Sequence, residues 1–148
     1  MAYILSIDQG TTGTTAILFD TGWRAVARGY REITQIYPQA GWVEHDPEEV
    51  WASVLEAAGQ ALRLAGATVS DVTYLGIDNE GETVLVWDKA TGRPIYNAIV
   101  WQDRRTAQYA ERLSNEYGGM IQTKTALAAD AYFSATKLKW ILDNVPGA

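Results

Sequence analysis

A turn rich in glycine and threonine is the first segment whose residue types suit chemistry. It runs Asp8-Gln9-Gly10-Thr11-Thr12-Gly13 and follows a short apolar run. Hydroxyls and closely spaced backbone N–H groups in such a turn suit phosphate oxygens. Asp8 at its mouth suits Mg²⁺, directly or through water, because that ion favours carboxylates together with phosphate. No Gly-Lys-Ser/Thr follows, so this is not a Walker A loop. Taken alone, the segment is equally consistent with a threonine-rich hairpin.

A second candidate is the acidic segment Asp78-Asn79-Glu80-Gly81-Glu82. In an extended backbone, Asp78, Glu80 and Glu82 would point the same way, and their like charges would repel. Water, a cation or a hydroxyl-rich ligand would then have to meet them. Gly81 predicts a break in the strand that spreads these side chains, and carboxylates that accept from paired hydroxyls are what a polyol site requires. Alone, the segment favours a simpler interpretation, a solvated acidic turn.

The third candidate is aromatic. The chain has 6 Trp and 8 Tyr but only 2 Phe. Trp and Tyr combine a flat apolar face with a polar group, which suits the C–H faces of sugars and protein surfaces alike. Trp101 ends an apolar run and Tyr132 precedes a helix start. Singly, each is better explained as core or rim. The one histidine, His45, adjoins a helix cap, and we interpret it as structural.

The elements that must position these residues begin with three predicted strands, 3–7, 14–19 and 25–33, joined as an antiparallel meander. Asp46-Pro47 predicts the start of a helix, with Trp51, Leu55, Ala58 and Leu62 on its apolar face. Further strands are expected at 72–77, 83–87 and 95–101. Asp103 and Ser134 are candidate caps for two more helices. This order predicts an α/β domain with a mixed sheet.

Composition and charge narrow the function classes. The 148 residues are 47% apolar and 20% charged, which fits a single soluble domain, and they contain no cysteine for disulfides or thiolate chemistry. The net charge of −6 argues against a nucleic-acid partner, because phosphate backbones require a basic face. The apolar start lacks the flanks of a signal peptide and the length of a membrane span. We therefore expect a cytoplasmic protein that contacts no membrane.

Several segments together resemble one family, the FGGY carbohydrate kinases, and among them the glycerol kinases. The resemblance extends in order along almost the whole chain, and jointly its motifs are specific. The segments are Asp8-Gln9-Gly10-Thr11-Thr12, Gln35-Ile36-Tyr37-Pro38, Gly41-Trp42-Val43-Glu44-His45-Asp46-Pro47, Gly92-Arg93-Pro94-Ile95-Tyr96-Asn97-Ala98-Ile99-Val100-Trp101-Gln102 and Tyr132-Phe133-Ser134-Ala135-Thr136-Lys137.

The resemblance implies an actin/Hsp70/hexokinase-like (RNase H-like) fold and a kinase that uses ATP and Mg²⁺. It places Asp8 on the metal and phosphate side. It assigns the phosphate turn to Gly10, Thr11 and Thr12. On the acceptor side, Glu82 would accept from substrate hydroxyls, Trp101 would lie against the carbon chain of a polyol or sugar, and Tyr132 would hydrogen-bond it. We expect these last three residues to line one cleft.

The sequence also departs from the family pattern. Gly81 stands where glycerol kinases carry a substrate-binding arginine, and Glu80 replaces the usual glutamine. Thr15 replaces a second family arginine in the phosphate hairpin. We therefore include Gly81 and Glu80 among the substrate-side residues, and expect an acceptor other than simply glycerol.

The resemblance further places the general base in a later Gly-Asp-Gln segment and the adenine pocket in a second domain. Neither has a counterpart in these 148 residues. We therefore expect residues 1–148 to form an incomplete N-terminal acceptor- and phosphate-side domain. Such a domain would be inactive by itself and prone to self-association through uncovered apolar surface.

Two other functions remain open from the sequence. The chain could be a catalytically inactive domain that acts only in folding or association. It could also be an RNase H-like nuclease, which shares the opening meander and an aspartate in the first strand. The nuclease requires clustered carboxylates on two metals and a basic surface. The charge and the aromatic set argue against it.

Overall fold

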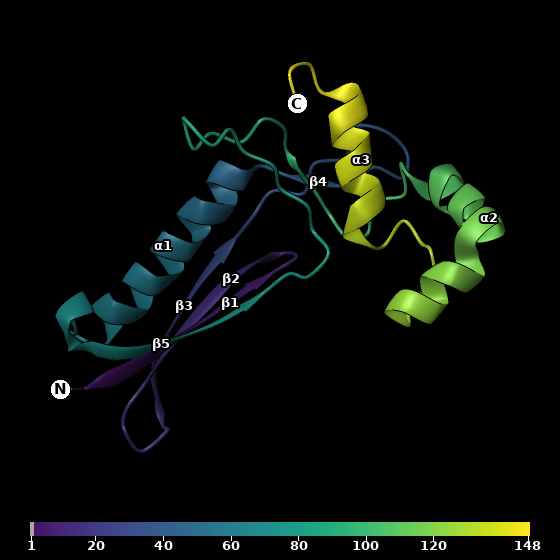
Figure 1. Ribbon diagram of the computed structural model, residues 1–148. Helices are drawn as coiled ribbons and strands as arrows, with labels where there is room; N and C mark the ends of the chain where they lie inside the picture. Colours follow the sequence, from purple (N-terminus) through teal and green to yellow (C-terminus); the bar gives the residue numbers. More distant parts are fainter. Residues whose placement is uncertain (1) are drawn as a thin grey trace. The chain divides into compact units, whose positions relative to one another are not determined.

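The computed structural model describes residues 2–148, which form two compact units (Figure 1). Of the described residues, the first unit comprises 2–34 and 46–80, and the second comprises 35–45 and 81–148. Helices and strands occur in both, so the predicted α/β class is confirmed. Each unit has a separate hydrophobic cluster.

The first unit is built on a four-stranded mixed sheet. Its strands are β1 (Tyr3–Gly10), β2 (Gly13–Phe19), β3 (Ala25–Glu32) and β5 (Val72–Asn79), in the spatial order β3-β2-β1-β5. The pairs β1–β2 and β2–β3 are antiparallel, as the predicted meander requires, whereas β1 and β5 are parallel. The predicted opening of the fold is therefore confirmed, and β5 forms an edge of the sheet.

Helix α1 (Pro47–Leu64) packs on one face of this sheet (Figure 1). Asp46 caps it by accepting from the backbone N–H of Glu48 at 2.9 Å. The predicted apolar face was wrong in part, since Trp51 and Leu55 are 59% and 54% exposed. The buried residues of α1 are instead mostly small: Ser53, Ala57, Ala61 and Leu62.

Close approach of two backbones explains this small face. A Cβ added at Gly29 of β3 would lie 2.0 Å from the carbonyl oxygen of Ala57. Bulky side chains in the contact would hold the helix away from the sheet, so glycine and alanine set the distance. Thr14 and Ser53 join the two layers inside this core through a buried hydroxyl–hydroxyl hydrogen bond of 2.7 Å.

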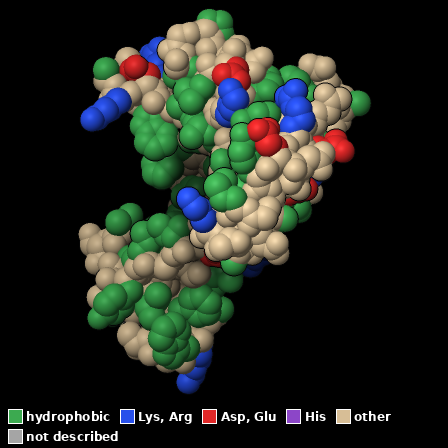
Figure 2. Space-filling view, turned by 45° about the vertical axis from the view of Figure 1, so that its right-hand side comes forward, with side chains coloured by type: hydrophobic (Ala, Val, Ile, Leu, Met, Phe, Trp, Pro, Cys, Tyr) green, Lys and Arg blue, Asp and Glu red, His purple; other side chains and the backbone are tan. Residues whose placement is uncertain are grey.

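Beyond the part covered by α1, the sheet edge is apolar and exposed. Tyr74, Leu75 and Ile77 of β5 are 57–68% exposed. Hydrophobic side chains are correspondingly prominent at the molecular surface in Figure 2. Among residues 2–148 no helix is both long and apolar enough to cross a bilayer.

The second unit contains two short strands and two helices. Strand β4 (Glu44–His45) pairs with β6 (Ala98–Ile99), and α2 (Ala107–Thr125) and α3 (Ser134–Asn144) follow. The longer strands predicted at 83–87 and 95–101 were wrong. Apart from β6, these segments make only isolated bridges, Val84 to Ile99 and Trp87 to Pro94. Proline cannot donate to a ladder, which limits pairing in the returning segment.

Two expectations about the helices of this unit also need correction. Asp103 does not cap α2, whose N-cap position is held by Thr106, and it is instead buried. Ser134 is the first residue of α3 rather than its cap. Of the apolar residues expected inward on α3, Ile141 is buried, but Leu142 is 56% exposed. His45 is buried and its Nε2 lies 2.9 Å from Oε1 of Gln35, which agrees with a structural role.

Candidate functional site

The phosphate-turn residues lie at the tip of the β1–β2 hairpin. Gly10 pairs with Gly13 across the hairpin, and Thr11 and Thr12 form the turn between them. The carbonyl oxygen of Thr12 accepts from the backbone N–H of Ile33 at 3.1 Å, which ties the turn to the end of β3. The strands on both sides hold the turn in place, so its small residues are presented from a fixed support.

Asp8 lies just before this turn, on the sheet face opposite α1. It is in register with Asp78 of β5, and both side chains are exposed. The carboxyl ends of two parallel strands therefore bring two carboxylates side by side. Exposed carboxylate oxygens of this kind are ligands that Mg²⁺ accepts. Within residues 2–148 no group of three or more metal-ligating side chains occurs.

Arg28 of β3 adds a cation to the same face. Its guanidinium donates to Oγ1 of Thr15 at 3.2 Å, and Thr15 is in register with Asp8. Position 15 lacks the arginine of the family pattern, and Arg28 was not among the predicted site residues. Only pairing of β2 with β3 brings it there, and alternation along β3 was the sequence signal that could have indicated its face.

Glu82 lies where the chain turns sharply after β5. Its φ is +60°, in the left-handed region that a residue with a side chain rarely adopts. Its Oε2 accepts from the backbone N–H of Ser134 at 2.7 Å and from the hydroxyl of Ser134 at 2.6 Å. The carboxylate thus binds the N-terminus of α3, where the helix dipole favours negative charge. Both hydrogen bonds end on Oε2, so Ser134 does not compete with a ligand for Oε1.

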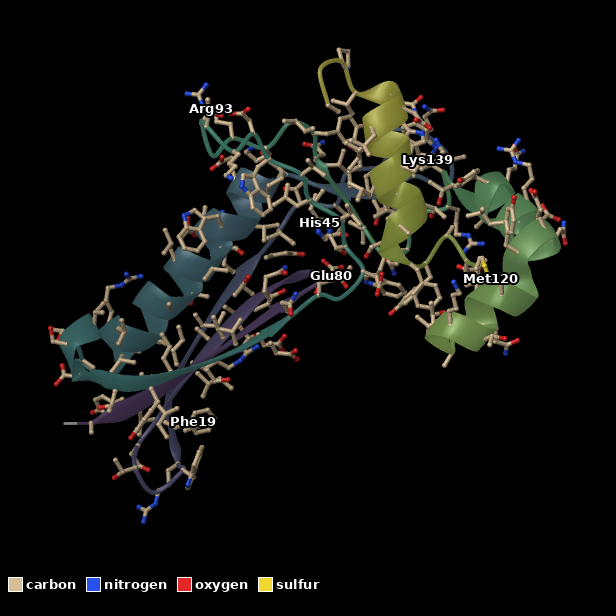
Figure 3. The ribbon with its side chains drawn as sticks, in the orientation of Figure 1. Phe19, His45, Glu80, Arg93, Met120 and Lys139 are labelled. Carbon is tan, nitrogen blue, oxygen red and sulfur yellow. The ribbon has the colours of Figure 1, made fainter. Side chains whose placement is uncertain are left out.

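Gly81, directly before Glu82, leaves space. Gly81 is exposed, and a Cβ added there would meet nothing within 4 Å. Glu80 precedes it, just beyond the end of β5 (Figure 3).

Trp101 and Tyr132 come together in the second unit. Their ring centroids lie 5.9 Å apart with the planes at 68°, an edge-to-face contact. The backbone N–H of Trp101 also donates to Oγ1 of Thr83, the residue after Glu82, at 3.3 Å. Tyr132 is 41% exposed, so its phenol remains accessible. Glu82, Trp101 and Tyr132 are therefore neighbours in space within the second unit.

The corner at residues 130–134 that carries Tyr132 is held by charged groups. Oδ1 of Asp130 accepts from the backbone N–H of Tyr132 at 2.7 Å and from Arg104 at 2.9 Å. Nζ of Lys137 donates to the carbonyl oxygens of Tyr132 and Phe133. The hydrogen bond to Tyr132 lowers the pKa of Asp130, with Arg104 and Lys137 adding to that effect.

A buried network around Arg105 was not predicted from the sequence. This side chain is fully buried, and it donates to Glu44 at 2.7 Å and to Asp103 at 2.9 Å. Trp42 and Trp140 lie against its guanidinium, at 3.8 and 4.5 Å from their ring centroids.

Burial opposes the charge of Arg105, but the hydrogen bonds to Asp103, Glu44 and Tyr96 raise its pKa overall. Burial likewise raises the pKa of Tyr96, whose hydroxyl donates to Glu44 at 2.7 Å. This network anchors the segment 96–105, and so the position of Trp101. Trp42 and Trp140 were a sequence signal that could have indicated it.

The candidate residues therefore form two groups. Asp8, Gly10, Thr11, Thr12 and Glu80 belong to the first unit. Gly81, Glu82, Trp101 and Tyr132 belong to the second. The first group suits phosphate and a cation, and the second suits hydroxyls and C–H faces.

Comparison with known proteins shows which family the chain resembles. The profile of the FGGY family of carbohydrate kinases, N-terminal domain, matches residues 3–148. The chain belongs to the FGGY family. It is 54% identical over 147 residues to a glycerol kinase of Rhizobium rhizogenes, covering 99% of this chain and 30% of that protein. A glycerol kinase of Bordetella pertussis is 55% identical, with 99% and 29% covered.

Solved structures agree with this placement in the FGGY family. The structure of Plasmodium falciparum glycerol kinase with ADP superposes with a TM-score of 0.89 and 35% identity, over 99% of this chain and 29% of that one. The chain thus spans about 30% of the length of the curated relatives it matches. The predicted actin/hexokinase-like fold and the FGGY resemblance are confirmed.

Proposed function

We propose that this chain forms the acceptor-binding and phosphate-facing part of an ATP-dependent carbohydrate kinase. The complete enzyme would transfer the γ-phosphoryl group of ATP to a terminal hydroxyl of glycerol or of a related polyol or ketose. One observation carries the acceptor side: the Trp101–Tyr132 ring pair lies beside Glu82, whose carboxylate is already fixed by Ser134. Membership of the FGGY family and the names of the relatives support the reaction class.

We call Glu82, Trp101 and Tyr132 the acceptor cluster. It would hold the substrate hydroxyls in place before reaction. Ser134 binds Oε2 of Glu82, so a substrate hydroxyl would donate to Oε1 without moving the carboxylate. The phenol of Tyr132 exchanges hydrogen bonds with a second hydroxyl, and the ring of Trp101 covers the C–H face. Groups fixed in advance lose little entropy on binding, which aligns the reacting oxygen.

The phosphate side lies in the first unit. Asp8, with Asp78 beside it, would hold Mg²⁺, and Gly10, Thr11 and Thr12 would contact the phosphate. Mg²⁺ bound there would offset the negative charge of the transferred group. Arg28 donates to Thr15 on the same face and supplies the cation that position 15 lacks.

We also propose that residues 1–148 do not turn over substrate alone. The resemblance assigns the general base and the adenine pocket to segments with no counterpart here. A positioned general base contributes about 10²–10⁴-fold to rate, and alignment contributes about 7–11 kcal/mol. The assay is ADP release with ATP, Mg²⁺ and a panel of acceptors. Acceptor-dependent turnover that Asp8→Asn abolishes would overturn this part of the proposal.

The acceptor itself is proposed to be longer than glycerol. Gly81 leaves open space next to Glu82, where an arginine would otherwise donate to hydroxyls. A polyol or ketose of four to six carbons would fill that space. Losing one charged hydrogen bond costs about 1.5–3 kcal/mol, or roughly ten- to a hundredfold in affinity. Gly81→Arg should therefore shift preference towards glycerol, and a strong preference for glycerol before that change would contradict the proposal.

Binding of the acceptor is tested by saturation-transfer NMR with glycerol and with four- to six-carbon polyols and ketoses. The comparison is between Glu82→Gln and the matched control Glu111→Gln, an exposed glutamate on α2. We expect Glu82→Gln to weaken binding roughly ten- to a hundredfold and the control to leave it unchanged. Absence of binding to the whole panel, or equal binding by both variants, would reject the acceptor site and favour an association module.

A further inference from the structure

Lys137 is the most unusual charged residue of the second unit. It lies in the first turn of α3, and its side chain is fully buried, at 0% exposed. Its ammonium reaches back to the carbonyl oxygens of Tyr132 and Phe133, the second at 3.4 Å. Lysine is rarely buried to this extent unless it is paired, and here its hydrogen bonds end on main-chain oxygens of the corner that carries Tyr132.

This position is unfavourable for a positive charge. The N-terminal turn of a helix is the positive end of its dipole. Burial lowers the pKa of Lys137, whereas Glu82, Asp103 and Asp130 raise it and Arg104 lowers it further. A methionine would fill the same volume without these costs. The presence of a charged ammonium at this buried position is therefore best explained by the backbone groups that it binds.

What it holds is the backbone of Tyr132. The N–H of Tyr132 is bound by Asp130 at 2.7 Å, and its carbonyl oxygen is bound by Lys137. Both backbone groups of the residue are thus fixed by side chains of opposite charge. Two residues later, Ser134 engages Glu82. Lys137 therefore holds the segment that sets the direction of the Tyr132 ring and the clamp on Glu82.

We propose that Lys137 is a positioning residue for the acceptor cluster. Without touching the acceptor, it fixes Tyr132 against Trp101 and keeps Ser134 in place on Glu82. The part that concerns the acceptor rests on the proposed function. The part that concerns the two rings stands on geometry alone, so the two can be tested separately.

The experiment uses ¹⁹F NMR of the 148-residue chain labelled with 5-fluorotryptophan, which gives 6 resonances. Trp101→Phe assigns the Trp101 resonance, and Tyr132→Ala defines its position when the neighbouring ring is absent. Lys137→Met should move the Trp101 resonance towards that second position and weaken polyol binding at least tenfold. The matched control is Lys139→Met on the same helix (Figure 3), whose lysine is 49% exposed and paired with Asp143. It should change neither quantity.

A rescue experiment separates charge from shape. The chain contains no cysteine, so Lys137→Cys can be alkylated at one site after unfolding and then refolded. Aminoethylation restores an ammonium at the length of lysine, whereas propylation gives a neutral group of the same shape. We expect the aminoethyl form to recover the native Trp101 resonance and polyol affinity, and the propyl form to resemble Lys137→Met.

Each outcome decides one point. An unchanged Trp101 resonance in folded Lys137→Met overturns the positioning role. Failure of both neutral forms to fold, as shown by circular dichroism, also overturns it, because the residue would then serve stability. If the resonance moves as expected but the unsubstituted chain binds no polyol, positioning stands and the proposed acceptor site fails.

Discussion

The two units use their carboxylates in opposite ways. In the first, Asp8 and Asp78 lie next to each other in register, and both are exposed. In the second, Glu44 and Asp103 are buried and bound to a guanidinium that is itself fully buried, Arg105. Open carboxylates with like charge are available to a cation from solution. Closed ones are fixed as part of the structure and position what lies beside them.

The largest effect on stability is expected from breaking the buried ion-pair network of Arg105, Glu44 and Asp103. Arg105→Ala would leave Glu44 and Asp103 buried without their cation, and removing one partner of a buried ion pair costs about 3–5 kcal/mol. The rings of Trp42 and Trp140 would also lose their contact with the guanidinium. We expect the second unit to unfold at a much lower urea concentration than in the unsubstituted chain. Tryptophan fluorescence measures this unfolding.

The neighbouring arginine is the control for this prediction. Arg104 is 53% exposed in its pair with Asp130, and pairs of that kind contribute about 0–1 kcal/mol. Arg104→Ala should therefore lower stability only slightly. Equal losses in the two variants would show that the buried network does not hold the second unit together.

In the first unit the largest effect should come from packing rather than from charge. Gly29→Ala would place a Cβ 2.0 Å from the carbonyl oxygen of Ala57, so α1 and β3 would have to separate. Overpacking of this kind costs about 1–3 kcal/mol. Gly76→Ala is the matched control, because a Cβ at that position of β5 meets nothing within 4 Å. Chemical unfolding of both variants measures the difference, and similar stabilities would contradict the close contact.

The same contrast explains which elements the sequence predicted. The meander was predicted from short runs of strand-forming residues and a glycine-threonine turn, which are local signals. The buried face of α1 was not predicted correctly. Hydrophobicity favoured Trp51 and Leu55, whereas the close approach of Gly29 selects small residues. That selection depends on which strand the helix meets, a non-local fact.

The candidate site shows the same limit. Trp101, Tyr132 and Glu82 were identified through family motifs, and the structure brings them together in one unit. Arg105 and Lys137 were not identified, since a charged residue in a sequence predicts an exposed position. Their burial becomes visible only when the carboxylates and carbonyl oxygens around them are placed.

A smaller effect should appear in the pH dependence of the second unit. Burial holds the pKa of Lys137 below its ordinary value of 10.5. Between the folded pKa and 10.5 the unfolded chain binds more protons, so stability rises with pH through that window. Below the folded pKa the penalty of burying the charge is fully present. The charged groups that act on the ammonium are Glu82, Asp103, Asp130 and Arg104.

This prediction is measured as the stability of the unsubstituted chain minus that of Lys137→Met, by urea unfolding from neutral pH to about pH 10. The difference should increase with pH. Lys139 gives the opposite sign, because its hydrogen bond with Asp143 raises its pKa. Its contribution is present below 10.5 and is lost as pH rises through the folded pKa. A flat difference for Lys137→Met would mean that its ammonium is not desolvated.

The smallest effect on stability, and the one that tests the open arrangement, is expected from Asp8→Asn. Asp8 and Asp78 are directly adjacent in the β1–β5 register, and like charges that lie close together repel each other. Removing one of them should therefore leave the metal-free chain equally stable or slightly more stable, which is the reverse of the loss expected when Arg105 is removed. Added Mg²⁺ should raise the melting temperature of the unsubstituted chain, because a ligand that binds only the folded state stabilises it. Asp8→Asn should abolish that increase, whereas Asp20→Asn, in the β2–β3 turn, should retain it. A clear loss of stability in metal-free Asp8→Asn would mean that this carboxylate is a structural group like those of the second unit, and the contrast between the two units would no longer hold.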